Sequence, residues 1–129
     1  MNLTDSVRFV GHVDDVQYFF SKIDLLVVPS HYEPFGYINI EAGRHGIPVI
    51  GTRVGGIPEI IEDDRTGLLI APHSPSQISE SCKNLFANRD RCRRMGLAAK
   101  KRIESTFAHS VQMSKCPNVQ MPKCPNGRT

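Results

Sequence analysis

The 129 residues contain no apolar run long enough to cross a bilayer, which excludes a membrane-spanning helix. The first residues, MNLTDSVRFVG, lack the basic stretch and the apolar segment of a secretory signal. From these two absences we expect a cytoplasmic protein. The net charge of +3 is too small to indicate nucleic-acid binding by itself.

The four cysteines lack the spacing of a metal site. Cys82, Cys92, Cys116 and Cys124 form no CxxC pair, and no histidine stands near them at zinc-ligand spacing. We therefore expect reduced thiols, no metal and no cofactor. Two of the cysteines belong to residues 112–129, where MSKCPNVQ and MPKCPNGR repeat one proline-containing unit. We expect this tail to be disordered, with a two-cysteine metal clip as the alternative.

Residues 1–111 have the pattern of one α/β domain, in which short apolar runs alternate with amphipathic segments. Strands are expected at residues 7–11, 24–30, 48–52 and 66–71. Helices are expected after Asp14, at residues 36–45, near Pro58, and at residues 75–88 and 89–106. The helix at 75–88 is predicted to have Ile78, Cys82, Leu85 and Phe86 on one face. Continuous apolar strands separated by helices predict a parallel sheet that is covered on both faces.

The stretch PSHYEPFGYINIEAGRHGIPVIG, residues 29–51, combines two acids with a glycine at an expected helix start. In parallel sheets ligands bind beyond the carboxyl ends of the strands, so this loop is expected to line a site. Gly36 lets a ligand approach closely, and the N–H groups that follow it favour a phosphate or a sugar hydroxyl. Glu41, more than a turn into the helix, suits a vicinal diol such as a ribose.

Simpler explanations remain open for both acids. Glu33 also fits as a charge that complements the helix N-terminus, and Glu41 fits as part of a solvated helix face. A second glycine turn in TRVGGIPE places Gly55 and Gly56 at the end of the adjacent strand, where they suit the same pocket. His31 lies beside Glu33, although a histidine in a loop is more often simply solvated.

Residues 29–70 closely resemble the C-terminal nucleotide-sugar-binding domain of family 4 retaining glycosyltransferases, which have the GT-B fold, and the resemblance extends over roughly residues 7–107. Glu33 and Glu41 match the E-x7-E motif of that family, and FVGHV, GIPVI, VGGIPEII and TGLLI match in order and spacing. A departure is Gly43, where the family commonly has an apolar residue and where glycine is expected to loosen the helix.

The resemblance implies a role for each matching residue. Glu33 is the implied catalytic residue, which orients the transferred sugar and stabilises charge rather than acting as a proven nucleophile. Backbone groups of Phe35, Gly36 and Tyr37 are implied to bind the sugar or the distal phosphate, and Glu41 the ribose. The remaining implied contacts are main-chain contacts to the nucleobase from Gly11, His12 and Val13. The donor would be a UDP-, GDP- or ADP-linked hexose, transferred to an unknown acceptor.

The resemblance covers only part of a GT-B enzyme. No residues match the acceptor domain or the first two strands of the donor domain, so we expect a partial Rossmann-like sheet that is inactive in isolation. The strand at residues 24–28 is then expected to have an open edge. Three outcomes follow for this edge: another chain completes it, two copies associate through it, or residues 7–10 pack beside it.

Two other classes of function remain as alternatives. The first is a nucleotide or nucleotide-sugar binding module without turnover. The second is nucleic-acid binding by a set of basic residues, which we set aside as a solvated helix face because Asp90 and Glu104 balance it and no aromatic residues are interleaved. That set comprises Lys83, Arg89, Arg91, Arg93, Arg94, Lys100, Lys101 and Arg102.

Overall fold

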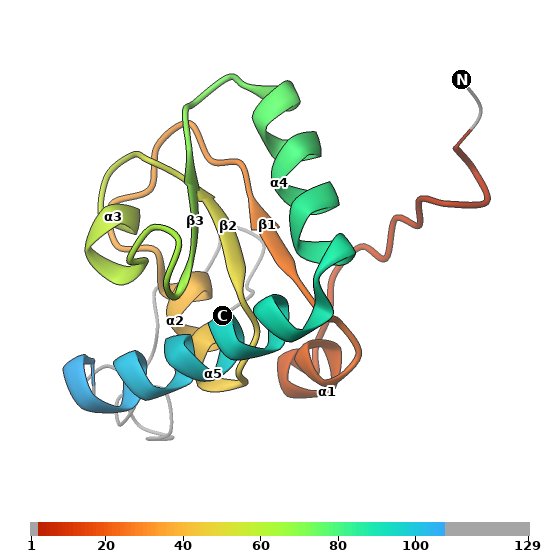
Figure 1. The fold of residues 1–129 in the computed structure, drawn as a ribbon. Coiled ribbons are helices and arrows are strands. Elements are labelled where there is room, and N and C mark those ends of the chain that lie inside the picture. Colours follow the sequence, from red (N-terminus) through yellow and green to blue (C-terminus); the bar gives the residue numbers. More distant parts are fainter. Residues whose placement is uncertain (1–2, 108–129) are drawn as a thin grey trace.

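The computed structural model describes residues 3–107, which form a three-stranded parallel sheet with helices on both faces (Figure 1). The tail expected at residues 112–129 lies outside the described residues. The strands are β1 (Leu26–Val28), β2 (Val49–Thr52) and β3 (Gly67–Ile70), in the order β1-β2-β3. The helices are α1 (Val16–Ser21), α2 (Tyr37–Arg44), α3 (Ile57–Ile60), α4 (Pro75–Ala87) and α5 (Arg89–Thr106).

Side chains that alternate along the strands divide the core into two layers. Val49 of β2 joins Ile40, Ala42 and Ile57 on the face covered by α2 and α3. Its neighbour Ile50 joins a second cluster on the face covered by α4. The predicted α/β sheet covered on both faces is therefore confirmed. Among the described residues, no helix is both long and apolar enough for a membrane span.

Helix α5 packs against both layers. Met95, near its start, is buried in the cluster with Ile50, Ile70 and Leu85. Ile103, near its end, is buried in the cluster on the opposite face of the sheet. The helix crosses the amino-terminal ends of the strands between these two points (Figure 1).

Gly43 of α2 lies in close contact with α5. It is buried, and a Cβ atom placed on it would lie 2.6 Å from Cγ1 of Ile103. The glycine is thus needed to admit the side chain of Ile103. The expectation that Gly43 loosens the helix did not include the contact between Gly43 and Ile103, because this contact appears only in the tertiary structure.

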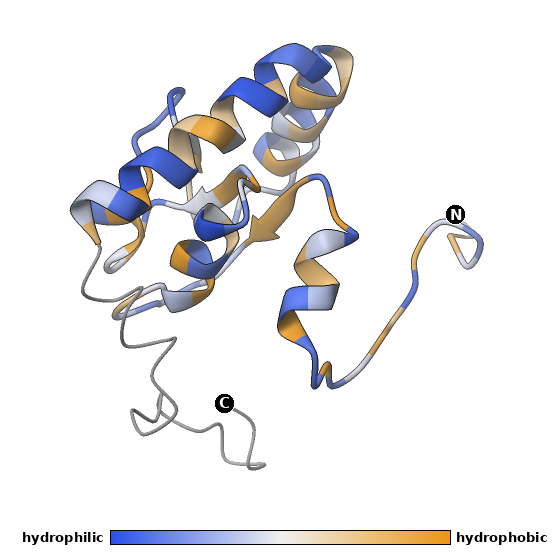
Figure 2. Ribbon diagram, turned by 90° about the horizontal axis from the view of Figure 1, so that it is seen from below, coloured by the Kyte–Doolittle hydropathy of each residue, from blue (hydrophilic) through white to orange (hydrophobic). Residues whose placement is uncertain are grey.

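The strand predicted at residues 7–11 is wrong. The segment has no strand pairing, and its apolar side chains are exposed, with Phe9 at 96%. It leads away from the rest of the domain, and hydrophobic residues lie along it (Figures 1 and 2). A strand requires a neighbour for its backbone hydrogen bonds, and no described strand pairs with this segment. Packing of residues 7–10 beside β1, one of the three expected outcomes, is therefore also wrong.

Candidate functional site

The loop between β1 and α2 forms a turn that is fixed at the start of the helix. Gly36 precedes α2 with a left-handed φ of 72°, which favours glycine. Its N–H group donates to Oε1 of Glu33 over 3.1 Å. Its carbonyl oxygen accepts from Nδ2 of Asn39, a buried side chain, over 3.2 Å. The side chains of Glu33 and Asn39 thus each stabilise the turn by a hydrogen bond to the backbone of Gly36.

The glycine turn after β2 supports the same loop through its backbone. The N–H group of Gly56 donates to the carbonyl oxygen of Glu33 over 2.9 Å. A Cβ atom on Gly55 would lie only 1.9 Å from that oxygen, so no side chain fits between the two loops. The prediction that the two glycine turns lie together at the carboxyl ends of adjacent strands is confirmed.

The first turn of α2 opens toward solvent beside an aromatic pair. The rings of Phe35 and Tyr37 stack with their centroids 5.6 Å apart, and Phe35 is 62% exposed. The first N–H groups of a helix have no acceptor within the helix, and the positive end of its dipole lies there. An anionic or hydroxyl-rich ligand is therefore suited to this position.

Glu41 is half-buried and ion-paired. Nη1 of Arg44 lies 3.2 Å and 3.3 Å from its two carboxylate oxygens. The ring nitrogen Nδ1 of His45 hydrogen-bonds with the Glu41 carbonyl over 2.8 Å, and this ring stacks on Phe20. Arg44 on the same helix thus fixes the orientation of the Glu41 carboxylate, which is only 22% exposed.

The remaining predicted contacts are not brought to this loop by any described interaction. Gly11 is exposed, and an added Cβ atom would meet nothing within 4 Å. Nε2 of His12 lies 2.7 Å from Oδ1 of Asp14 in the same segment, and Val13 is half-buried. Their proposed contacts with a nucleobase stay a prediction. Within residues 3–107 there is no group of three or more potential metal-ligating side chains.

Three residues near the site were not predicted from the sequence. Asn39 and Arg44 stand three residues after Gly36 and Glu41, a helical spacing that would have signalled both contacts. His73, in the loop after β3, stacks on His31 with a centroid distance of 4.3 Å. No sequence pattern joins two histidines that are 42 positions apart, because their contact depends on how the loops meet at the end of the sheet.

Comparisons with known proteins agree with this geometry. Residues 1–102 match the family model for glycosyl transferases group 1. Glycogen synthase from Mycobacterium tuberculosis is 32% identical over 104 residues, which are 79% of this chain and 25% of that protein. The chain spans only about a quarter of the length of that curated relative.

Solved structures share the fold. Sucrose-phosphate synthase from Thermosynechococcus elongatus matches 88% of this chain and 30% of its own, with a TM-score of 0.80 and 34% identity. Alr3699/HepE from Anabaena, solved with UDP and glucose, matches 88% of this chain and 32% of its own at a TM-score of 0.78. Its identity of 22% shows the fold alone. The chain therefore belongs to the group 1 family of glycosyl transferases, and its sheet and helices are those of a GT-B glycosyltransferase domain.

Proposed function

We propose that this chain is the donor-binding part of a retaining hexosyltransferase and is catalytically inactive in isolation. The observation that carries the proposal is the fixed turn from Glu33 to Gly36, which places a carboxylate and the start of α2 beyond the carboxyl end of β1. The relatives support a hexosyl donor, since they include a glycogen synthase and a sucrose-phosphate synthase. We also keep the expectation of a cytoplasmic location.

The proposed role of Glu33 follows from its hydrogen bond. Oε1 already accepts from the Gly36 N–H, which holds the carboxylate over the helix start. Its second oxygen is then available to accept from a sugar hydroxyl, while the backbone around Phe35 and Tyr37 binds the distal phosphate. In a reaction that retains the anomeric configuration, Glu33 orients the sugar and stabilises positive charge at the anomeric carbon.

Glu41 is the proposed ribose-binding residue. A carboxylate accepts two hydrogen bonds from a vicinal diol, and Arg44 fixes its orientation before the ligand arrives. The nucleobase is then proposed to meet the main chain of residues 11–13. No metal or cofactor is part of this proposal.

Titration of the full chain with UDP, GDP, ADP and their glucosyl forms, followed by two-dimensional amide NMR, tests donor binding. We expect shifts concentrated at Gly36, Tyr37 and Glu41, with one base preferred. Shifts at Gly11 to Val13 would support the base contact. Dispersed spectra that none of these ligands changes would contradict the donor-binding role.

The variant Glu41→Ala tests the ribose contact. We expect it to weaken nucleoside diphosphate binding about tenfold or more, because a hydrogen bond to a charged group contributes about 1.5–3 kcal/mol. The 2′-deoxy nucleotide should bind the wild-type chain more weakly but lose little further affinity in the variant. The matched control is Glu104→Ala, which removes one exposed carboxylate from α5. If Glu41→Ala weakened the binding of ribo- and deoxynucleotides equally, Glu41 would not contact the ribose 2′-hydroxyl.

The alternative, a non-catalytic binding module, predicts the same result in the NMR titration. Sugar transfer after addition of the separately produced N-terminal half of a group 1 relative separates the two. Transfer supports an incomplete enzyme, and binding without transfer supports the module.

The open edge of the sheet leads to a prediction about assembly. Within residues 3–107, β1 pairs only with β2, so its other edge is unpaired. We propose that another chain or a second copy covers it, since unpaired edges promote association. Light scattering at increasing concentration should show a rising mass, or a stable complex once a partner is added. A monodisperse monomer at high concentration would exclude association of two copies.

A further inference from the structure

A cavity of about 160 Å³ lies at the end of the sheet opposite the glycine turns. It forms where the segments that lead into β1 and β2 meet the junction of α4 and α5. Ile23 and Asp24 come from the first segment, and residues 46–48 come from the second. The cavity therefore adjoins the amino-terminal ends of the strands, whereas Glu33 follows the carboxyl end of β1.

Part of the cavity lining is apolar. Leu85 is fully buried and Ile47 is nearly so, and Ile23 and Pro48 complete this lining. Phe86 also borders the cavity and is 52% exposed. Phe86, predicted on one face of α4 with Leu85, does not share the burial of Leu85, and its ring borders the cavity and solvent.

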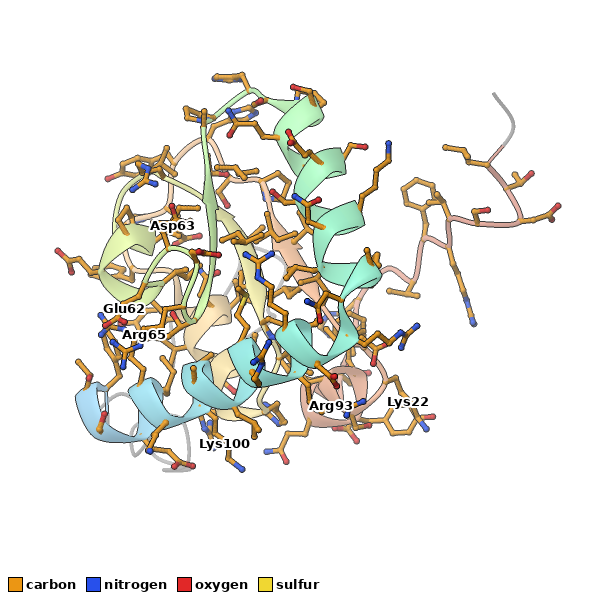
Figure 3. All side chains as sticks on the ribbon, in the orientation of Figure 1. Lys22, Glu62, Asp63, Arg65, Arg93 and Lys100 are labelled. Atoms are coloured by element: carbon orange, nitrogen blue, oxygen red, sulfur yellow. The ribbon has the colours of Figure 1, made fainter. Side chains whose placement is uncertain are left out.

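The lining also includes two arginines. Arg89 and Arg93 line the cavity, and Asp24 is the one carboxylate that does so. Arg93 has only a long contact of 3.9 Å with the exposed Asp90, and no ion pair of Arg89 occurs within the described residues. Figure 3 shows Arg93 near the α1 end of the molecule, away from Glu62 and Asp63.

Two other arginines of α5 are already engaged. Arg91 pairs with Asp64, and Arg102 pairs with Glu62 while it also donates to two backbone carbonyl groups. Arg89 and Arg93 lack such strong partners among the described residues. The two cavity arginines are thus available to an anionic ligand in a way that these helix neighbours are not.

The thiol of Cys92 also lines the cavity. Burial raises its pKa, Asp24 raises it further, and Arg89 and Arg93 lower it. The thiol is therefore within the electrostatic reach of both arginines. An anion bound between them would cover the thiol and cancel the positive charge that favours its thiolate form.

We propose that this cavity binds an organic acid whose carboxylate is attached to an apolar group the size of a phenyl ring or a leucine side chain. A cavity of about 150 Å³ holds a benzene molecule, which sets the size of the apolar group. The carboxylate lies between Arg89 and Arg93, and the apolar group packs on Leu85, Ile47 and Phe86. The same chemistry occurs in a small free acid and in the C-terminal residue of another protein. The inference does not depend on the proposed donor site.

Phenylacetate and an acetylated tetrapeptide that ends in leucine test the two sources. Each is added to the full chain, with 2-phenylacetamide and the peptide amide as uncharged controls. We expect amide shifts at Phe86, Cys92 and Arg93 and slower alkylation of Cys92 by iodoacetamide, measured by peptide mass spectrometry. Cys82 is the internal reference, since burial raises its pKa too but it does not line the cavity.

The double variant Arg89→Gln/Arg93→Gln tests whether the two arginines bind the carboxylate of the ligand. We expect about fivefold weaker binding of the acids for each arginine removed. This factor corresponds to the upper end of the contribution that an exposed ion pair makes. Arg94→Gln is the matched control, because Arg94 lies on the same helix outside the cavity lining. Spectra as dispersed as those of the wild type show that the variants fold.

The outcomes separate the two sources. Binding of phenylacetate alone indicates a small acid, and tighter binding of the free peptide indicates a protein C-terminus. Either result supports the proposal. It is overturned if neither acid changes the spectrum and the Cys92 rate, if the uncharged controls bind equally well, or if Arg94→Gln weakens binding as much as the double variant.

Discussion

The variant Gly55→Ala is expected to lower the free energy of unfolding by about 3 kcal/mol and to remove the amide shifts caused by nucleotides. The added Cβ atom would lie 1.9 Å from the carbonyl oxygen of Glu33, which is a backbone atom without a rotamer to change. Overpacking costs about 1–3 kcal/mol. The left-handed φ of 55° adds about 1–2 kcal/mol for a residue with a Cβ atom. Urea denaturation measures the first effect, and the NMR titration measures the second.

Gly11→Ala is a control for backbone strain alone. Gly11 has a similar φ of 66°, but an added Cβ atom would meet nothing within 4 Å. We expect this variant to lose no more than about 1–2 kcal/mol of stability, the cost of the left-handed backbone alone. If Gly55→Ala were no more destabilising than Gly11→Ala, the two loops would not be in the close contact on which the proposed site depends.

Gly43 and Ile103 are expected to show a strong energetic coupling. Ile103→Ala removes a fully buried side chain and should cost about 3 kcal/mol. Gly43→Ala should cost about 1–2 kcal/mol, because the clash with Cγ1 of Ile103 exceeds the gain of about 1 kcal/mol in helix propensity. In the double variant the new methyl group partly fills the space left by the isoleucine. The double variant should therefore be more stable by about 1 kcal/mol or more than additivity predicts.

Leu97 provides the control on the same helix. It is 62% exposed, so Leu97→Ala should change the stability by no more than about 0.5 kcal/mol. Its effect should add to that of Gly43→Ala, since Gly43 contacts Ile103 and Ala99 rather than Leu97. Strict additivity for Gly43 and Ile103, measured by urea denaturation, would contradict the close contact between α2 and α5.

The sequence predicted the helices and the three strands of the sheet well, because the signals of these elements are local. The residues 75–88 and 89–106 expected as helices correspond to α4, which begins at Pro75, and α5, whose N-cap Asn88 accepts from the Arg91 N–H. β2 was recognisable as a continuous apolar run, and all four of its residues are buried. A helix satisfies its own backbone hydrogen bonds, so a local pattern suffices to predict it.

The failures concern partners that a local pattern cannot reveal. Residues 7–11 have the composition of a strand, but no described strand takes up their backbone hydrogen bonds. Phe86 follows the apolar spacing of α4, yet the buried face ends with Leu85. Gly43 seemed a weakness of α2 because its reason, the side chain of Ile103, lies 60 positions later in the sequence.

The candidate site was predicted only in part for the same reason. The turn at Gly36 and the neighbouring turn at Gly55 and Gly56 follow from where strands end, and the structure brings them together. The pairing of Glu41 with Arg44 and the contact of His31 with His73 depend on side-chain orientation. The contacts assigned to Gly11, His12 and Val13 rest on family resemblance and await the titration.

Because α5 closes both layers of the core, the order of synthesis constrains how this domain folds. A nascent chain that ends before Met95 has the whole sheet but lacks the residues that complete the two apolar clusters. The strands are then covered incompletely on either face until the last turns of α5 leave the ribosome. Stable folding should therefore appear late and abruptly during translation, as Ile103 emerges, and the interval before it is when the sheet is most exposed to aggregation.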